Sequence, residues 1–421
     1  MTLTFYQNGI VRMLMTEPGV NRFRISQEEV EPVVWEQLIA VDLTDKITMS
    51  EDKKTLTVSG LKHEEGDEDW TYTIDLPKFR MNQLQNGEQK QTLVVNPQDT
   101  LYFETESATM SPPLYGSDAN GAAIPQLKPK ISSKVGRDVY RTIPESDAAS
   151  LRGGVNRGIG LGFFMPSETL YGLGEREDTL VLKRTTDSTP YEMWAFDSPH
   201  EPNHMNGLYG NMPYVQGIGE SSSQAVTWMN SAHTWVFLDD MTFEDQVGSS
   251  INFVSETGAL ELFLFSSSVE TKEGSLNRNK RVTNALTTVT GFAPLPPLHT
   301  LGFHVSKYDI ASAEIIMERN RNFTDYQFPV DVLVMDIQWA DFNSEADGYE
   351  YFRFNPQNFT STDLAQMNKE VEEAGRYMTT ILDPHIKVSD DYFVYADGQD
   401  LEKQSTSTDV QSIFVKDPSG E

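Results

Sequence analysis

Hydrophobic and polar residues alternate along much of the first half of the chain. The pattern is clearest in WTYTIDL, where Trp70, Tyr72, Ile74 and Leu76 fall on one face and polar residues on the other. Successive side chains of a strand point to opposite faces, so this alternation predicts a half-buried strand in an antiparallel sheet. Similar short segments recur to about residue 266. Many short strands at this spacing predict a β-sandwich.

A long segment of different composition interrupts this pattern. Residues 105–160 are rich in proline, glycine, serine and alanine and poor in large hydrophobic residues, which predicts a loop or an insertion. The alternating pattern does not continue beyond the proline-rich stretch GFAPLPPL. We therefore expect two domains, a β-sandwich over residues 1–295 and a second domain over residues 296–421.

Strand and helix patterns alternate in the second domain. The apolar run VDVLVMD does not alternate, which is typical of a strand buried on both faces. The order β-α-β-α-β predicts a parallel α/β sheet or barrel, and the polar residues after 385 predict a loop-like end. The expected strands are 301–305, 330–337 and 377–384, and the expected helices are 311–323 and 362–374.

The second of these helices has a defined start. Leu364, Met367 and Val371 fall on one stripe of a 3.6-residue period. Thr360 stands three residues before Asp363, the spacing of a capping box, in which each side chain bonds the backbone N–H of the other residue. The sequence therefore predicts that Thr360 is the N-cap.

Composition and charge narrow the possible partners. The chain has 421 residues and a net charge of −30, with 33 basic and 63 acidic residues. This charge argues against a nucleic-acid partner, because binding to phosphates requires a basic face. No apolar run is long enough for a membrane span, and the N-terminus does not have the layout of a secretory signal. The absence of cysteine excludes disulfides and thiolate metal sites.

The ends of the predicted parallel strands carry the candidate chemistry, because ligands of α/β sheets and barrels bind at the C-terminal ends of strands. His304 and Tyr308 lie near the end of the first strand, Asp336 at the second and Asp383 at the third. Two acids on successive strands favour a site, although each could instead cap the next element. His304 alone also fits a hydrogen-bonded core histidine. The spacing is not typical of metal ligands, and we expect neither a metal nor a cofactor.

A second candidate lies in the sandwich. Residues 191–215 combine tryptophan, phenylalanine, histidine and tyrosine side chains with Asp197. Sugars bind to flat aromatic faces through their C–H groups and to carboxylates through their hydroxyls. The alternative is that the aromatic residues, such as Tyr209 and Tyr214, fill the sandwich core.

Six stretches of the chain stand out when they are taken together and in order. They are YTIDLPKFRMNQLQNG, LYGLGEREDTLVLK, WAFDSPHEPNHMNGLYGNMPY, PPLHTLGFHVSKYD, PVDVLVMDIQWAD and ILDPHIKV. Together they resemble glycoside hydrolase family 31, and within it the endoplasmic-reticulum glucosidase II α subunits. The resemblance implies a β-sandwich followed by a (β/α)8 barrel, and retaining hydrolysis of α-glucosides without a cofactor.

The resemblance also implies roles for single residues. Asp336 matches an acid that binds hydroxyls of the sugar at the cleavage subsite, and Asp197 matches an acid that reaches toward the leaving-group sugar. Ile337 and Ile381 match apolar walls of the cleavage subsite, and Tyr308 matches an aromatic position. The roles of Asp383 and His385 are implied to be mainly structural. The chain departs from the family pattern at Val305 and Lys307, and also at Asn355, where the family usually has an aspartate.

The same resemblance implies that the two catalytic carboxylates are missing. Retaining glycosidases use a nucleophile and an acid/base about 5–5.5 Å apart, and the family segments that supply them do not occur in this chain. We therefore expect the N-terminal part of an α-glucosidase: the sandwich and the first three β/α units of an incomplete barrel, inactive by itself. The alternative is a non-catalytic carbohydrate-binding paralogue or a pseudogene fragment. The implied partners are an α-glucoside or glucosylated N-glycan, a regulatory β subunit and the missing barrel half, in the endoplasmic-reticulum lumen.

Overall fold

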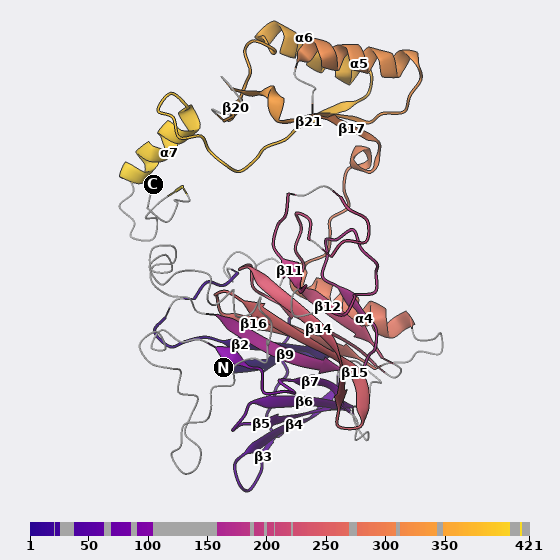
Figure 1. The fold of residues 1–421 in the computed structure, drawn as a ribbon, viewed down its shortest axis with the longest axis vertical. Coiled ribbons are helices and arrows are strands. Elements are labelled where there is room, and N and C mark those ends of the chain that lie inside the picture. The colour runs from indigo at the N-terminus through magenta and orange to yellow at the C-terminus, as the bar shows by residue number, and fades with distance from the viewer. Residues whose placement is uncertain are drawn as a thin grey trace. The chain divides into compact units, whose positions relative to one another are not determined.

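The chain forms two compact units, Met1–Phe292 and Ala293–Glu421, which Figure 1 shows in a computed structural model. The predicted insertion spans residues 105–160. Most of it, up to residue 157, lies outside the residues that the structure describes. Those described are residues 1–20, 22–25, 38–62, 69–85, 91–103, 158–185, 189–197, 200–205, 207–219, 222–268, 276–308, 312–342, 348–404 and 413–414.

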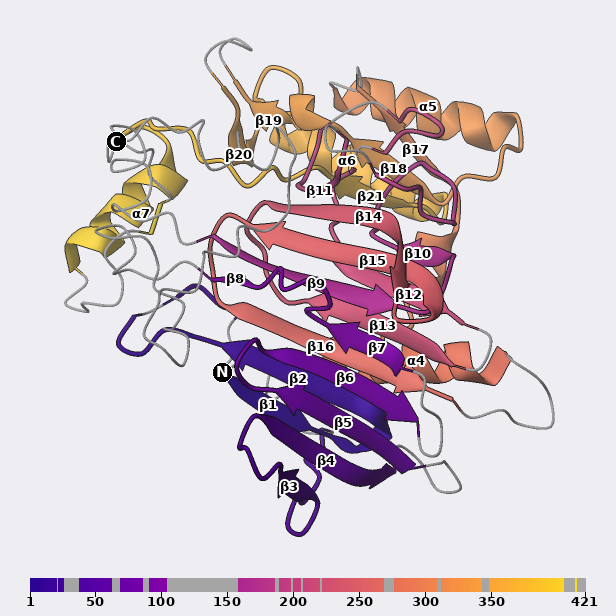
Figure 2. The same cartoon turned by 60° about the horizontal axis from the view of Figure 1, so that its bottom comes forward.

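Two antiparallel sheets build the first unit. One is six-stranded, in the order β1-β2-β16-β13-β12-β10. The chain therefore brings its first strands beside β16, which lies more than two hundred residues later in the sequence (Figure 2). The strands of this sheet are β1 (Thr2–Phe5), β2 (Ile10–Met15), β10 (Leu170–Gly172), β12 (Tyr214–Ile218), β13 (Ser223–Trp228) and β16 (Leu260–Ser267).

The second sheet is ten-stranded. Its order is β11-β14-β15-β9-β7-β6-β5-β4-β3, and β8 also pairs with β9. The strands are β3 (Ile47–Met49), β4 (Thr55–Lys62), β5 (Asp69–Asp75), β6 (Arg80–Gln85), β7 (Gln91–Val95), β8 (Tyr102–Phe103), β9 (Ile159–Met165), β11 (Tyr191–Met193), β14 (Thr234–Phe243) and β15 (Gln246–Ser255).

Strand β5 confirms the alternation seen in the sequence. Trp70, Tyr72 and Ile74 are buried, while the residues between them are partly exposed. Leu76 was expected on the same face, but it is 46% exposed because the strand ends at Asp75. Side chains from both sheets form one buried core, so the predicted β-sandwich is confirmed.

A helix covers the outer face of the six-stranded sheet. Helix α4 (Leu276–Thr290) packs on β13 and β16. Its residues Val282, Ala285 and Val289 contact a second cluster of buried side chains that includes Phe263 and Phe265. Strands β13 and β16 are therefore covered on both faces, which explains why all eight residues of β16 are buried.

The second unit contains a parallel sheet of the order β17-β18-β21. Helices α5 and α6 pack against each other (Figure 1) and bury Ile316, Met367 and Val371 against the residues of the sheet. The predicted β-α-β-α-β order is thereby confirmed. Its elements are β17 (His304–Lys307), α5 (Ala313–Asp325), β18 (Val332–Met335), α6 (Ser361–Glu373) and β21 (Tyr377–Thr380).

Two local expectations about the second unit were wrong, and one pair of strands was not predicted. Residues Leu298–Leu301 form a 3-10 helix, η4, so the first strand begins only at His304. A short antiparallel pair, β19 (Ala340–Asp341) and β20 (Glu350–Phe354), follows β18. Helix α7 (Phe393–Gln404) forms in the stretch that polar composition predicted to be a loop. Tyr392 just before this helix is fully buried and donates to the Tyr351 carbonyl at 2.7 Å, which anchors the start of α7.

The N-terminus of α6 confirms the predicted capping box. The Thr360 hydroxyl accepts a hydrogen bond from the Asp363 N–H, and the Asp363 carboxylate accepts one from the Thr360 N–H. Gly375, just beyond the helix, has a φ of 71°. This conformation suits glycine because it has no Cβ.

Replacing Thr360 with alanine should destabilise the second unit by about 0.5–2 kcal/mol, because the N–H of Asp363 loses its acceptor. Thermal unfolding should show a midpoint lowered by a few degrees. Ser361→Ala, one position inside the helix, is the matched control and should have a smaller effect. Equal effects of the two changes would contradict the assigned cap.

Candidate functional site

Asp336 directly follows strand β18 and begins the 3-10 helix η5 (Ile337–Trp339). Its Oδ1 accepts a hydrogen bond from the Ile337 N–H at 2.8 Å. Its Oδ2 has no hydrogen-bond partner among the described residues. The carboxylate is partly exposed. One oxygen therefore fixes the side chain, and the other is available to a ligand.

Trp339 connects the end of β18 to the end of β21. Its Nε1–H donates to the Ile381 carbonyl at 2.8 Å, and the side chain is only 4% exposed. The Ile381 N–H donates to the Met335 carbonyl at 3.1 Å, which extends the pairing of the two strands. Ile337 follows β18 and Ile381 follows its neighbour β21, and both side chains are partly exposed.

Tyr351 of β20 holds Asp383. The Tyr351 hydroxyl donates to Asp383 Oδ2 at 2.6 Å, and the tyrosine is 1% exposed. Burial, this hydrogen bond and the nearby charges of Asp383 and Asp336 raise the pKa of Tyr351 above its usual range. The phenol therefore stays protonated at physiological pH and keeps donating to Asp383. The His385 ring meets the Tyr351 ring edge-on at 5.4 Å.

The four residues Asp336, Ile337, Ile381 and Asp383 all follow neighbouring strands of the parallel sheet at their C-terminal ends. His385 joins them through Tyr351. Tyr308 follows Lys307, the last residue of β17, and is 57% exposed at the same end of the sheet. Asp336, Asp383 and Tyr308 were proposed from their places near the ends of predicted strands. Ile337, Ile381 and His385 were proposed from the family resemblance alone.

His304 does not join this group. It is the first residue of β17 and pairs in register with Val332, whereas Asp336 follows the last pair of the register, Lys307 with Met335. At about 3.3 Å per residue, the length of the strand separates His304 from Asp336. Its ring contacts the His299 carbonyl at 3.4 Å. The expectation that His304 marks the end of its strand was wrong because the strand begins later than its apolar residues indicate.

Asp197 lies in the sandwich unit, on the loop after β11. It is exposed and accepts a hydrogen bond from the Tyr209 hydroxyl. Tyr209 is itself 69% exposed, so it does not fill the sandwich core. Tyr214, by contrast, packs against the cluster under α4. The predicted role of Asp197 toward a leaving-group sugar stays a prediction.

Two residues of the site were missed by reasoning from the sequence. Trp339 and Tyr351 connect the strand ends through hydrogen bonds to Ile381 and Asp383. Trp339 could have been found, because it stands three residues after the strand-end acid. Tyr351 was missed because its place beside Asp383 depends on the β19–β20 pair. That pair was not predicted, although Asp347–Gly348 between the two strands is a typical turn signal.

The departure at Asn355 has a structural explanation. The residue is 4% exposed, and its Oδ1 accepts from the Gln357 N–H at 3.0 Å. Its own N–H donates to the Trp339 carbonyl. An aspartate would accept the same bond from Gln357, so the asparagine preserves the local turn without a buried charge.

The site offers carboxylates and apolar walls rather than a metal centre. Among the described residues, no three histidine, cysteine or acidic side chains are grouped as they would be around a metal ion. None of the described helices has the length and apolarity needed to cross a membrane. An acid with a free oxygen, flanked by two isoleucines, is chemically suited to a neutral molecule with hydroxyls and C–H faces.

Two family models match the chain. The glycosyl hydrolase 31 N-terminal galactose mutarotase-like domain matches residues 1–236, and the glycosyl hydrolases family 31 TIM-barrel domain matches residues 293–420. The first match covers more than half of the chain and most strands of the sandwich, and the second includes the strand-end site.

Curated relatives match in part of their length. Human neutral alpha-glucosidase AB is 29% identical over 260 residues, which is 58% of this chain and 26% of the relative. A probable glucan 1,3-alpha-glucosidase of Arabidopsis thaliana is 28% identical over 275 residues, 61% of this chain and 27% of the relative. The chain thus spans about a quarter of the length of these relatives.

Solved structures share the fold. The catalytic subunit in a complex of ER glucosidase II with the binding domain of its regulatory subunit has a TM-score of 0.70 at 21% identity. The match covers 98% of this chain and 43% of that chain. A family 31 dextranase of Flavobacterium johnsoniae, complexed with glucose, has a TM-score of 0.61 at 14% identity. The match covers 98% of this chain and 39% of the dextranase chain. At these identities the likeness concerns the fold.

Proposed function

The chain belongs to glycoside hydrolase family 31, and we propose that it carries a glucose-binding wall of an α-glucosidase. The observation that carries the proposal is Asp336, which follows a parallel strand with Oδ1 fixed by the Ile337 N–H and Oδ2 without a partner among the described residues. Ligands of parallel α/β folds bind at this end of the strands. The curated relatives are named as α-glucosidases, which indicates the sugar.

In this proposal each group has one task. Asp336 Oδ2 accepts hydrogen bonds from the sugar hydroxyls, and charge assistance makes these bonds strong. Ile337 and Ile381 contact C–H groups of the ring. Tyr351 and Asp383 do not touch the sugar but keep the end of β21 in place beside β18. Tyr308 supplies an aromatic face at the same sheet end.

Hydrolysis requires more than these residues supply. Retaining glycosidases need two carboxylates about 5–5.5 Å apart, one as nucleophile and one as acid/base. Of the acids described above, Asp336 is assigned to binding and Asp383 is held by Tyr351. The sheet β17-β18-β21 is also three-stranded, whereas a closed barrel of this type has eight strands. We infer that residues 1–421 alone bind the sugar weakly and do not cleave it.

The finer assignments follow the relatives. We propose that the substrate is terminal α-linked glucose of an oligosaccharide or N-glycan, that a regulatory subunit binds the protein, and that it works in the endoplasmic-reticulum lumen. The support is the likeness to an ER glucosidase II catalytic subunit crystallised with the binding domain of its regulatory subunit.

The test uses the purified 421-residue chain with p-nitrophenyl α-glucoside as substrate and methyl α-glucoside as ligand. We expect saturable binding of methyl α-glucoside in ligand-observed NMR and no release of p-nitrophenol above the buffer rate. Turnover would contradict the inferred inactivity. Methyl β-galactoside is the matched control ligand, and equal binding of the two would contradict the glucose-binding wall.

A further inference from the structure

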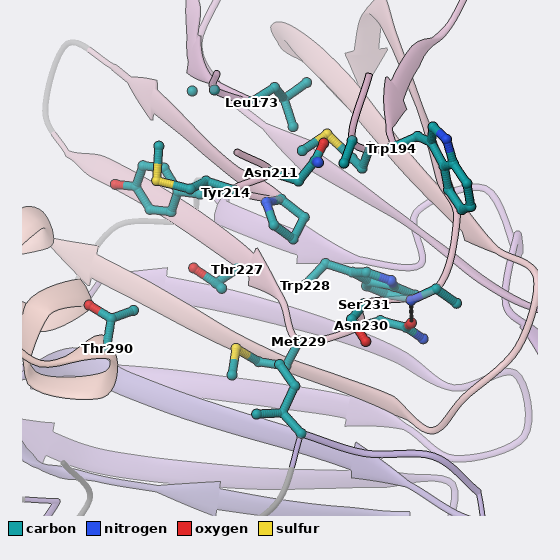
Figure 3. A pocket seen from close by; sticks show the side chains of 18 of the residues that line it. Leu173, Trp194, Asn211, Tyr214, Thr227, Trp228, Met229, Asn230, Ser231 and Thr290 are labelled. Atoms are coloured by element: carbon teal, nitrogen blue, oxygen red, sulfur yellow. Dashed lines mark hydrogen bonds between the residues drawn. The ribbon is translucent and has the colours of Figure 1, made fainter. Parts of the chain in front are cut away.

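A separate pocket lies within the sandwich unit. Its volume is about 810 Å³, and it opens between the strands β10, β12 and β13, the loop after β11 and helix α4. Figure 3 shows Trp228, Met229 and Thr290 on one side and Trp194 and Asn211 on the other. The pocket shares no residue with the site around Asp336.

The wall of the pocket is apolar but contains hydrogen-bonding atoms. No charged residue is among the residues of the described chain that line it. Thr227 is 7% exposed, and its Oγ1 is buried without a hydrogen-bond partner among the described residues. The Oδ1 of Asn211, on the opposite side, is also buried and unpartnered there. Buried polar groups usually have a hydrogen-bond partner. We therefore expect these two atoms to bond to a donor or acceptor of a bound molecule.

One wall of the pocket requires a glycine. Gly172, at the end of β10, has a φ of 125°, and a Cβ at this position would collide with the Tyr214 carbonyl. The close approach of β10 to β12 forms one wall of the pocket. At the rim, Trp194 is 50% exposed and Met212 is 58% exposed. The rim of the pocket is thus accessible.

We propose that this pocket binds an uncharged, mainly apolar small molecule with one hydroxyl-type group. Pockets that bind such molecules typically have about 300–1,000 Å³, apolar walls and a few polar groups that orient the ligand. The uncharged lining disfavours ions, because a buried charge without a partner is costly. Thr227 and Asn211 select for a hydroxyl, which both donates and accepts. This site goes beyond the glucose-binding wall and does not depend on it.

The probe for the test is 4-propylphenol, compared with 4-propylbenzoate, which has the same chain but a negative charge. Calorimetry on the 421-residue protein should detect saturable binding of the phenol and at least tenfold weaker binding of the benzoate. No saturable binding of the phenol, or equal binding of both compounds, would overturn the proposal.

Variants locate the site. Thr227→Val removes an unpartnered hydroxyl and keeps the side-chain shape, so the fold should persist while phenol binding weakens about two- to tenfold. Ser231→Trp, at an exposed lining position, should block the pocket and abolish binding. Thr71→Val on β5 is the matched control and should bind as the wild type does. Unchanged binding in Ser231→Trp, or equal loss in Thr71→Val and Thr227→Val, would overturn the proposal.

Discussion

Asp336→Asn should weaken the binding of methyl α-glucoside about 10- to 100-fold. A hydrogen bond to a charged group contributes about 1.5–3 kcal/mol, which corresponds to this range of Kd. The amide oxygen of asparagine can still accept from the Ile337 N–H, as Asp336 Oδ1 does at 2.8 Å. The local turn should therefore persist, and only the charge and one acceptor are lost. Ligand-observed NMR titration measures the effect.

The same strand provides the control. Asp331 precedes β18 as Asp336 follows it, and its Oδ2 also accepts a backbone N–H, that of Phe303, at 2.9 Å. Asp331→Asn makes the same chemical change at the opposite end of the sheet. It should leave sugar binding unchanged. Equal losses in the two variants would mean that net charge or stability, rather than the strand end, determines binding.

Trp339→Ala should unfold the second unit while the sandwich stays folded. Removing a buried tryptophan costs about 3–5 kcal/mol, and here the Ile381 carbonyl also loses its donor. A domain is stable by only about 5–15 kcal/mol, and the parallel sheet of this unit has three strands among the described residues. Hydrogen-exchange mass spectrometry should show lost protection in peptides from β18 and β21 and unchanged protection in β9 and β16.

Tyr326→Ala is the matched control for this change. It removes an aromatic side chain from the same unit, at the end of α5, where the ring is 82% exposed. Exchange in β18 and β21 should stay as in the wild type. If Trp339→Ala also left these strands protected, the bond from Trp339 to Ile381 would not hold the strand ends together.

The parts predicted correctly from the sequence are those in which local pattern and tertiary packing agree. Trp70, Tyr72 and Ile74 alternate and are buried, and the Thr360–Asp363 box forms the helix start that its spacing predicts. Asp336 and Asp383 could be placed because each follows, within three residues, a strand that the sequence predicted. In each case, the residues that produce the signal lie within a few positions of one another in the sequence.

The errors arose where tertiary contacts outweigh local pattern. His304 was placed at the wrong end of its strand because Leu301, where the strand was expected to begin, is the last residue of a 3-10 helix. Helix α7 was missed because its anchor, the bond from Tyr392 to Tyr351, joins residues far apart in the sequence. The pocket below Trp194 was not foreseen, because three strands, a loop and a helix from distant parts of the chain form it together.

The central claim is that glucose contacts the ends of β18 and β21. Methyl NMR with selectively labelled isoleucine tests it directly, since Ile337 and Ile381 line the proposed wall and Ile316 of α5 is buried behind the sheet. Addition of methyl α-glucoside should shift the Ile337 and Ile381 methyl signals along one common saturation curve and leave Ile316 unchanged. Shifts confined to isoleucines of the sandwich, such as Ile251, would contradict the claim.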